Sequence, residues 1–222
     1  MKYNALGRTD IRISGVSYGG IVSAGFYDNV HYPTEGQAAS DRYVAWAVDH
    51  GVNYFDVAPS YQDAEEKLGN SLKPYRKDIY LACKTNCRLK KDAEVEFANS
   101  LKLLHTDYFD TYQLHGLSSV EEVETAFGPG GVMEMMSRVK QEGLVRRLGI
   151  TCHSEKAALR AIELYDFDSV LFPFNWHMNL AHGMGSRLIK TAKAKNMGVL
   201  AMKQLIERAW KDGDDAMRAR VP

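Results

Sequence analysis

Cysteine is scarce in this chain. The 222 residues contain only three, Cys83, Cys87 and Cys152. An odd and sparse set does not suit a disulfide framework, and Cys83 and Cys87 have no second pair at the spacing of zinc ligands. We therefore expect a reducing, cytoplasmic location and no metal site.

The sequence also lacks an excess of either charge and any long apolar run. Lysine plus arginine and aspartate plus glutamate each number 28, so net charge gives no reason to expect a nucleic acid or an anionic membrane as a partner. No stretch approaches the roughly 20 apolar residues of a membrane span, and the N-terminal segment MKYNALGRTD is polar. We expect no nucleic-acid partner, no membrane segment and no export. The oligomeric state has no signature in the sequence.

A G-x-G-x-x-G phosphate motif is missing as well, because the glycine-rich segment SYGGIVSAG does not have that spacing. What is present is a regular alternation of strand-like and helix-like segments, which predicts parallel strands joined by helical crossovers. The expected strands are 12–20, 53–58, 78–85, 107–115, 145–152, 168–174 and 197–203. The expected helices are 34–51, 60–72, 91–105, 132–143, 154–165 and 185–196. With 45% hydrophobic residues, positions 1–222 are expected to form a single domain.

Four polar residues lie at or just after the ends of three of these strands: Asp56, Tyr61, Lys84 and His115. The carboxyl ends of parallel strands meet at one rim, where a carboxylate, a phenol, an amine and an imidazole can form a proton-transfer site. Taken singly, each residue fits an ordinary turn, packing or surface role. Their joint placement favours a (β/α)8 barrel over an open sheet.

Five segments carry a more specific pattern. LGRTDIRIS, GVNYFDVAPSY, IYLACKT, DYFDTYQLHG and VRRLGIT occur in this order and resemble the aldo-keto reductase family over nearly the whole chain. The resemblance implies an α/β fold of the (β/α)8 TIM barrel type and a reduced nicotinamide cofactor across the carboxyl face. NADPH is expected, with NADH as the alternative, and the substrate is expected to be a small-molecule carbonyl compound. The catalytic tetrad of the family falls on Asp56, Tyr61, Lys84 and His115.

The resemblance gives each member of the tetrad a role. Tyr61 is the expected proton donor, but a free phenol titrates at about 10, so a nearby ammonium is needed to lower its pKa. Lys84 provides that ammonium, and Asp56 is the carboxylate that keeps Lys84 protonated despite burial. His115 is expected to donate a hydrogen bond that orients the carbonyl, provided its reacting nitrogen carries the proton.

The resemblance also implies a set of cofactor contacts, in which the chain departs from the family. The expected cofactor-binding residues are Gly20, Ile21, Asp56, Thr151, Cys152, Asn175, Met202 and Lys203. Cys152 stands where most members have an asparagine that holds the nicotinamide carboxamide, and a thiol is a poor substitute. Met202 replaces a frequent aromatic residue. Lys203 is expected either to reach a phosphate or to be a solvated loop lysine.

The end of the sequence departs most from the family. After 197–203 we find no further strand pattern and no K-x-x-x-x-R segment, so the eighth strand is expected to be missing and the barrel incomplete at the C-terminus. A shortened sequence is favoured over a natural seven-stranded enzyme. The altered contacts leave two functions open: an NAD(P)H-dependent aldehyde or ketone reductase, and a non-catalytic sensor or regulatory subunit. A third, an isomerase, would need a phosphate site after the seventh and eighth strands.

Aromatic residues in two loops suggest the character of the substrate pocket. An aromatic, moderately apolar pocket is expected from Phe26, Tyr27, His31, Trp176 and His177, with ordinary loop packing as the alternative.

Overall fold

A computed structural model gives the structure of the chain and describes residues 1–24, 26–27, 30–31 and 36–204. The side chains of the five residues expected to line the substrate pocket lie outside the described part, so that expectation stays a prediction.

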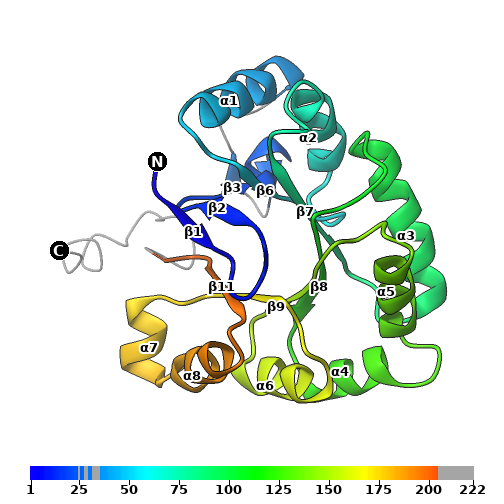
Figure 1. Cartoon of the computed structure of the whole chain (residues 1–222), viewed down its shortest axis with the longest axis vertical. Helices are drawn as coiled ribbons and strands as arrows, with labels where there is room; N and C mark the ends of the chain where they lie inside the picture. Colours follow the sequence, from blue (N-terminus) through cyan, green and yellow to red (C-terminus); the bar gives the residue numbers. More distant parts are fainter. Residues whose placement is uncertain (25, 28–29, 32–35, 205–222) are drawn as a thin grey trace.

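The centre of the molecule is a parallel sheet that curls on itself (Figure 1). Within the described residues it has seven strands in the order β11-β10-β9-β8-β7-β6-β3. Each strand therefore pairs with the strand of this sheet that comes next along the chain. The strands are β3 (Tyr18–Gly19), β6 (Tyr54–Asp56), β7 (Tyr80–Thr85), β8 (Thr111–Leu117), β9 (Leu148–Cys152), β10 (Ser169–Phe172) and β11 (Gly198–Ala201). This sheet is a partial (β/α)8 barrel and confirms the expected fold class.

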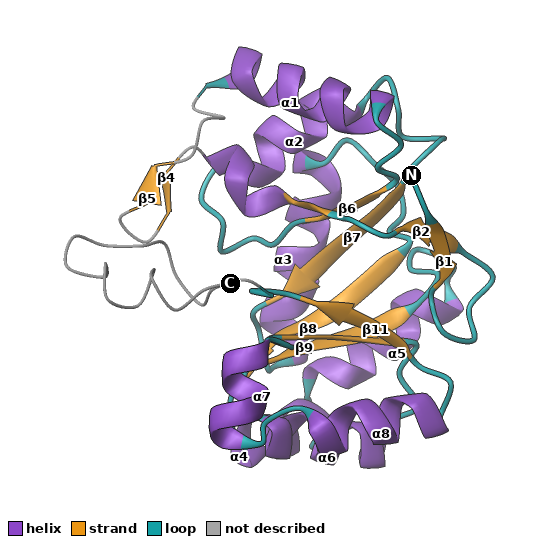
Figure 2. Cartoon of the chain, turned by 90° about the vertical axis from the view of Figure 1, so that its left-hand side faces the viewer, coloured by secondary structure: helices purple, strands orange, loops and turns teal. Residues whose placement is uncertain are grey.

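Helices cover the outer face of the sheet (Figure 2). They are α1 (Gln37–Asp49), α2 (Ala64–Leu72), α3 (Lys90–Leu103), α4 (Val120–Phe127), α5 (Val132–Gln141), α6 (Glu155–Leu164), α7 (Trp176–His182) and α8 (Ser186–Ala194). A 3-10 helix (Gly20–Ala24) follows β3, and a small hairpin pairs β4 (Phe26–Tyr27) with β5 (Val30–His31). Of the helices in the described residues, none has the length and apolar character needed to cross a membrane.

The main core lies between the sheet and the helices. Outward-facing strand residues such as Phe55, Leu81 and Leu114 are fully buried there. Met135 and Met136 of α5 are also fully buried and Met133 nearly so, and these methionines fill the core. Burying a side chain of this size stabilises the fold by about 1.5–3 kcal/mol, so these contacts hold the strands in the register that positions the carboxyl rim.

An N-terminal hairpin covers the opposite, amino-terminal end of the sheet. It pairs β1 (Tyr3–Ala5) with β2 (Arg12–Ser14) and packs Leu6 and Ile13 against the inner face of the sheet. A Cβ on Gly7, which has φ +58°, would lie 2.2 Å from the backbone nitrogen of Gly198, so only glycine allows this approach. The expected single strand over 12–20 was therefore wrong: its first half belongs to the hairpin, and only β3 joins the sheet.

Helix boundaries differ from the sequence expectations in several places. The helix expected over 60–72 begins at Ala64, and its N-cap residue is Asp63. In α3 the side chains of Ala93 and Phe97 are buried, whereas Val95 is 71% exposed. A helix cannot present both faces to one sheet, and the larger Phe97 decides which one is buried.

Two helices were missed. No helix was expected between the strand 107–115 and the helix 132–143, but Val120–Phe127 form α4, whose N-cap Ser119 accepts a hydrogen bond from the backbone N–H of Glu122. The segment before the last expected helix contains α7, capped by Asn175. The expected helix start at Thr34 lies outside the described residues, and α1 begins at Gln37.

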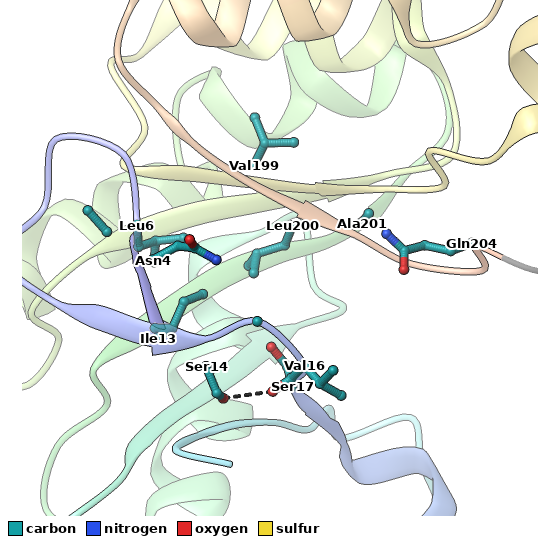
Figure 3. Close-up of a pocket in the computed structure, with 12 residues that line it drawn as sticks. Asn4, Leu6, Ile13, Ser14, Val16, Ser17, Val199, Leu200, Ala201 and Gln204 are labelled. Carbon is teal, nitrogen blue, oxygen red and sulfur yellow. Dashed lines mark hydrogen bonds between the residues drawn. The ribbon is translucent and has the colours of Figure 1, made fainter. Parts of the chain in front are cut away.

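A cleft of about 370 Å³ separates the N-terminal segment from β11 (Figure 3). It is lined by Asn4, Ala5, Leu6, Ile13, Ser14, Gly15, Val16, Ser17, Val199, Leu200, Ala201 and Gln204. In the described part of the chain, β11 and β3 are the two edges of the sheet. The cleft lies along the β11 edge, and its lining includes no member of the expected tetrad.

Candidate active site

The four tetrad residues come from three neighbouring strands and one turn. Asp56 ends β6, and Lys84 lies one residue before the end of β7. His115 lies in β8, where the pairing with β9 is irregular between Leu114 and Leu117, a feature common next to active sites. Tyr61 follows β6 in a turn closed by a hydrogen bond from its backbone N–H to the Ala58 carbonyl, at 3.0 Å.

Lys84 and Asp56 form a buried ion pair. Lys84 is fully buried, and its Nζ donates to Asp56 Oδ2 at 2.5 Å and to the carbonyl of Val57 at 3.0 Å. Burial alone would lower the pKa of Lys84, but the charge of Asp56, followed by that of Tyr61, outweighs it and raises the pKa. Asp56 therefore keeps the Lys84 ammonium protonated inside the sheet at neutral pH.

Tyr61 lies beside this charge and beside His115. The Nζ of Lys84 is 5.1 Å from the centroid of the Tyr61 ring. The Tyr61 and His115 rings meet edge to face, with centroids 5.8 Å apart. The structure thus brings all four tetrad residues together in one cluster at the carboxyl rim.

Two residues of the loop after β7, Asn86 and Arg88, form hydrogen bonds with His115. Its Nδ1 lies 2.7 Å from Oδ1 of Asn86, and its carbonyl accepts a hydrogen bond from Arg88 at 2.7 Å. Burial, then the positive charges of Lys84 and Arg88 and the neighbouring His153, lower the pKa of His115 to about 3. The imidazole is therefore neutral at physiological pH.

Gln113 is a member of the cluster that the sequence expectations missed. Its Nε2 donates to Asp56 Oδ1 at 2.9 Å, so that the Asp56 carboxylate receives Gln113 at one oxygen and Lys84 at the other. A period-2 argument could have found it, because Gln113 lies two residues before His115 and so shares its face of β8. Gly149 leaves room for it, since a Cβ there would lie 3.1 Å from Gln113 Cγ.

Two expected cofactor contacts on β9 point in opposite directions. Thr151 is buried, and its hydroxyl accepts a hydrogen bond from the backbone N–H of Gly116 at 2.7 Å. Cys152 is fully buried in the hydrophobic core under the helices, where burial raises the pKa of its thiol well above the ordinary value. Its side chain faces away from the rim, because successive residues of a strand alternate in direction.

The remaining expected contacts lie at the ends of β3, β10 and β11. Asn175 is used locally, since its Oδ1 accepts from the backbone of Met178 to cap α7. Met202 is half-buried, and Lys203 is exposed with φ +54°. Gly20 begins the 3-10 helix that includes Ile21, and a Cβ on Gly20 would lie 2.8 Å from the Asp56 carbonyl. Glycine at this position therefore lets the chain pass close to Asp56.

The rim residues fit a nicotinamide cofactor in part. Ideal Cβ atoms on Gly19 and Gly116 would meet no atom within 4 Å, so the ends of β3 and β8 face open space. The Thr151 hydroxyl, which accepts from Gly116, still has its own proton to donate to a carboxamide oxygen. Cys152 does not fit, because its thiol is turned into the core.

Comparison with known proteins agrees with this architecture. The profile of the Aldo/keto reductase family matches residues 28–215. The chain is 28% identical over 189 residues to the uncharacterized oxidoreductase YqkF of Bacillus subtilis, covering 79% of this chain and 56% of that protein. It is also 28% identical over 165 residues to the aldo-keto reductase YhdN of the same organism, covering 68% of this chain and 47% of that one. The chain thus spans about half the length of the curated relatives it matches.

Solved structures share the fold. The aldo-keto reductase AKR11C1 of Bacillus halodurans, in its holo form, superimposes with a TM-score of 0.74 at 22% identity, covering 96% of this chain and 71% of that one. The thermostable aldo-keto reductase Tm1743 gives a TM-score of 0.76 at 21% identity, covering 100% of this chain and 79% of that one. The family profile extends over most of the sequence, and the chain belongs to the aldo/keto reductase family.

Proposed function

We propose that this chain is an NADPH-dependent oxidoreductase, with NADH as the alternative cofactor, that reduces a small-molecule aldehyde or ketone to an alcohol. The observation that carries the proposal is the buried Lys84–Asp56 pair next to Tyr61, with the Lys84 Nζ 5.1 Å from the ring centroid. A buried ammonium held against a phenol has a clear chemical use, since it stabilises the phenolate that proton donation leaves behind.

Tyr61 gives its proton to the carbonyl oxygen as that oxygen becomes negative. The Lys84 Nζ lies 5.1 Å from the ring centroid of Tyr61. Opposite unit charges separated by about this distance attract by about 3 kcal/mol at an effective dielectric constant of 20, which corresponds to about a hundredfold in rate. Asp56 keeps the ammonium charged, and Gln113 fixes the carboxylate of Asp56. His115, in edge contact with Tyr61, orients the substrate beside the phenol.

The cofactor would lie along the rim. When bound, the reduced nicotinamide supplies the hydride. Thr151 would hold the carboxamide through its hydroxyl, Gly20 and Ile21 would contact the cofactor through their backbone, and Met202 would cover the ring with its thioether. Lys203 would reach a phosphate. Cys152 and Asn175 would contribute less than the sequence suggested, since one is turned into the core and the other caps α7.

The test is turnover in Tyr61→Phe. NADPH binding is followed by nicotinamide fluorescence, and oxidation of NADPH is then measured with an added aldehyde. We expect wild type and Tyr61→Phe to bind NADPH equally, and turnover in the variant to fall by about 10²–10⁴-fold, the typical contribution of a general acid. Turnover of the variant within a few-fold of wild type would refute Tyr61 as the proton donor.

A second function, a non-catalytic sensor or regulatory subunit that binds the cofactor, is favoured by one observation. The thiol of Cys152, at the position expected to hold the carboxamide, is fully buried in the core. The same assay separates the two functions, because a sensor binds NADPH but leaves it unoxidised when aldehyde is added.

A further inference from the structure

The peptide group that joins His115 to Gly116 lies outside the regular pairing of the sheet. Between Leu114 and Leu117, β8 advances by three residues while β9 advances by two, so β8 carries one extra residue there. On its other side, the ladder of β8 with β7 ends at Leu114. The carbonyl and the N–H of this bulged peptide group therefore need partners outside the regular ladders.

Two side chains provide these partners, one at each end of the peptide group. The carbonyl of His115 accepts a hydrogen bond from Arg88 Nη2 at 2.7 Å, and the N–H of Gly116 donates to Thr151 Oγ1 at 2.7 Å. Arg88 follows β7 and Thr151 lies in β9, so the group is held from both neighbouring strands. Gly116 has φ +62°, a backbone conformation that glycine adopts readily. The peptide group cannot turn over without breaking both hydrogen bonds.

Arg88 is itself fixed by its surroundings. Its Nη1 donates to the carbonyl of Asn86 at 3.1 Å, and its Nη2 also donates to Oε2 of Glu122 in α4 at 3.3 Å. The same carboxylate oxygen accepts from the backbone N–H of Ser118 at 2.9 Å. A guanidinium group carries its donors in one rigid plane, so a single arginine can bind the loop after β7, β8 and α4 at once. The side chain of Arg88 is only 18% exposed.

The bulged peptide group determines where the imidazole of His115 lies, because the backbone on both sides of Cα fixes the direction of the Cα–Cβ bond. The imidazole meets the ring of Tyr61 edge to face, with the two centroids 5.8 Å apart. A misplacement of about 1 Å at such a group can cost about a hundredfold in rate. Turnover should therefore depend on whatever holds this peptide group.

We propose that Arg88 and Thr151 are positioning residues that hold the His115–Gly116 peptide group and so keep the imidazole of His115 beside Tyr61. The proposal rests on the proposed function and gives Thr151 a role in addition to its cofactor contact. Two other roles for Arg88 predict different results. Arg88 could serve only as an ion-pair partner of α4, or it could act on His115 only through its charge.

Arg88→Met tests the proposal by removing the donors while keeping an unbranched apolar stem. We expect kcat at saturating NADPH to fall by about a hundredfold, with the Kd of NADPH unchanged. The matched control is Arg160→Met, because Arg160 donates to Glu124 of the same helix, α4, at the surface. Turnover in this control should stay within about twofold of wild type. Wild-type turnover in Arg88→Met, or equal losses in the two variants, would overturn the proposal.

A double-mutant cycle distinguishes positioning from an effect of charge. Thr151→Val removes the acceptor at the other end of the peptide group and keeps the shape of the side chain. Once Arg88 has been replaced, the group is already free to turn over, so the kcat loss caused by Thr151→Val should be about tenfold smaller than in wild type. Equal losses in both backgrounds would show that the two residues act separately, and would overturn the proposal.

The amide of Gly116 reports on the same peptide group without any turnover. Its hydrogen-exchange rate is measured by NMR with ¹⁵N-glycine labelling, relative to the other glycine amides. We expect exchange about tenfold faster in Arg88→Met and unchanged in Arg160→Met. If the wild type leaves NADPH unoxidised with added aldehyde, the proposed function is contradicted, and the exchange rates still decide this inference. Faster exchange in Arg88→Met alone supports it, and equal rates in the two variants contradict it.

Discussion

Removing the carboxylate of Asp56 should measure how much the Lys84–Asp56 pair contributes to the free energy of unfolding. In Asp56→Asn the shape of the side chain is kept, but the buried ammonium of Lys84 retains only the Val57 carbonyl and a neutral amide as partners. Breaking a buried ion pair by removing one partner typically costs about 3–5 kcal/mol. We expect the free energy of unfolding at pH 7, measured by urea denaturation, to fall by this amount.

The pH dependence gives the sign of the effect. In wild type the pKa of Lys84 is raised, so its stabilising contribution is fully present below about pH 10.4, the unfolded value, and is lost as pH rises through the folded pKa. In Asp56→Asn burial dominates and favours the neutral amine, so the stability of the variant rises with pH up to about 10.4. The deficit of the variant should therefore shrink as the pH approaches about 10.

Two further variants act as controls. The double variant Asp56→Asn with Lys84→Met removes both charges, and we expect it to recover most of the lost stability, since replacing a whole buried pair is often neutral. Glu94→Gln breaks the exposed pair with Arg138 and should cost less than about 1 kcal/mol. A deficit in Asp56→Asn below about 1 kcal/mol at pH 7, or one independent of pH, would refute the reasoning.

Two other outcomes follow from the site. Gln113→Leu removes the hydrogen bond to Asp56, so turnover should fall by about tenfold while stability stays within about 1 kcal/mol, as measured by NADPH oxidation and urea denaturation. Full activity would show that Gln113 does not support Asp56. His115 has a folded pKa of about 3, so its stabilising contribution is fully present above about pH 6.5 and is lost as the pH falls towards 3. His115→Gln should flatten this part of the stability profile, and an unchanged slope would contradict a buried neutral imidazole.

The parallel sheet was predictable from the sequence because strand and helix periods alternate regularly, and the family was predictable because five segments in order resemble it. The strand order along β6, β7 and β8 then places Asp56, Lys84 and His115 at one rim. The predictions failed where a short helix lies next to a glycine-rich segment. The helix α4 has only eight residues and is followed by glycine-rich residues, and its capping serine, Ser119, was overlooked. These failures concern packing and capping, which depend on neighbours that periodicity does not specify.

The support around the tetrad was less predictable than the tetrad itself. Gln113 and Asn86 act through hydrogen bonds to side chains far away in the sequence, such as Gln113 to Asp56. Asn175 shows the reverse case, since a residue assigned to the cofactor by resemblance caps a helix. A polar residue near a rim can serve either purpose, and only the partner that it contacts distinguishes the two.

The central claim is that the buried charge of Lys84 makes Tyr61 an effective proton donor. The most direct test is the rate of NADPH oxidation by Lys84→Met with saturating cofactor and aldehyde, with NADPH binding measured in parallel. The account predicts intact binding and a turnover lower by about a hundredfold or more, the effect of one unit charge about 5 Å away. Turnover within about threefold of wild type, with binding intact, would contradict it.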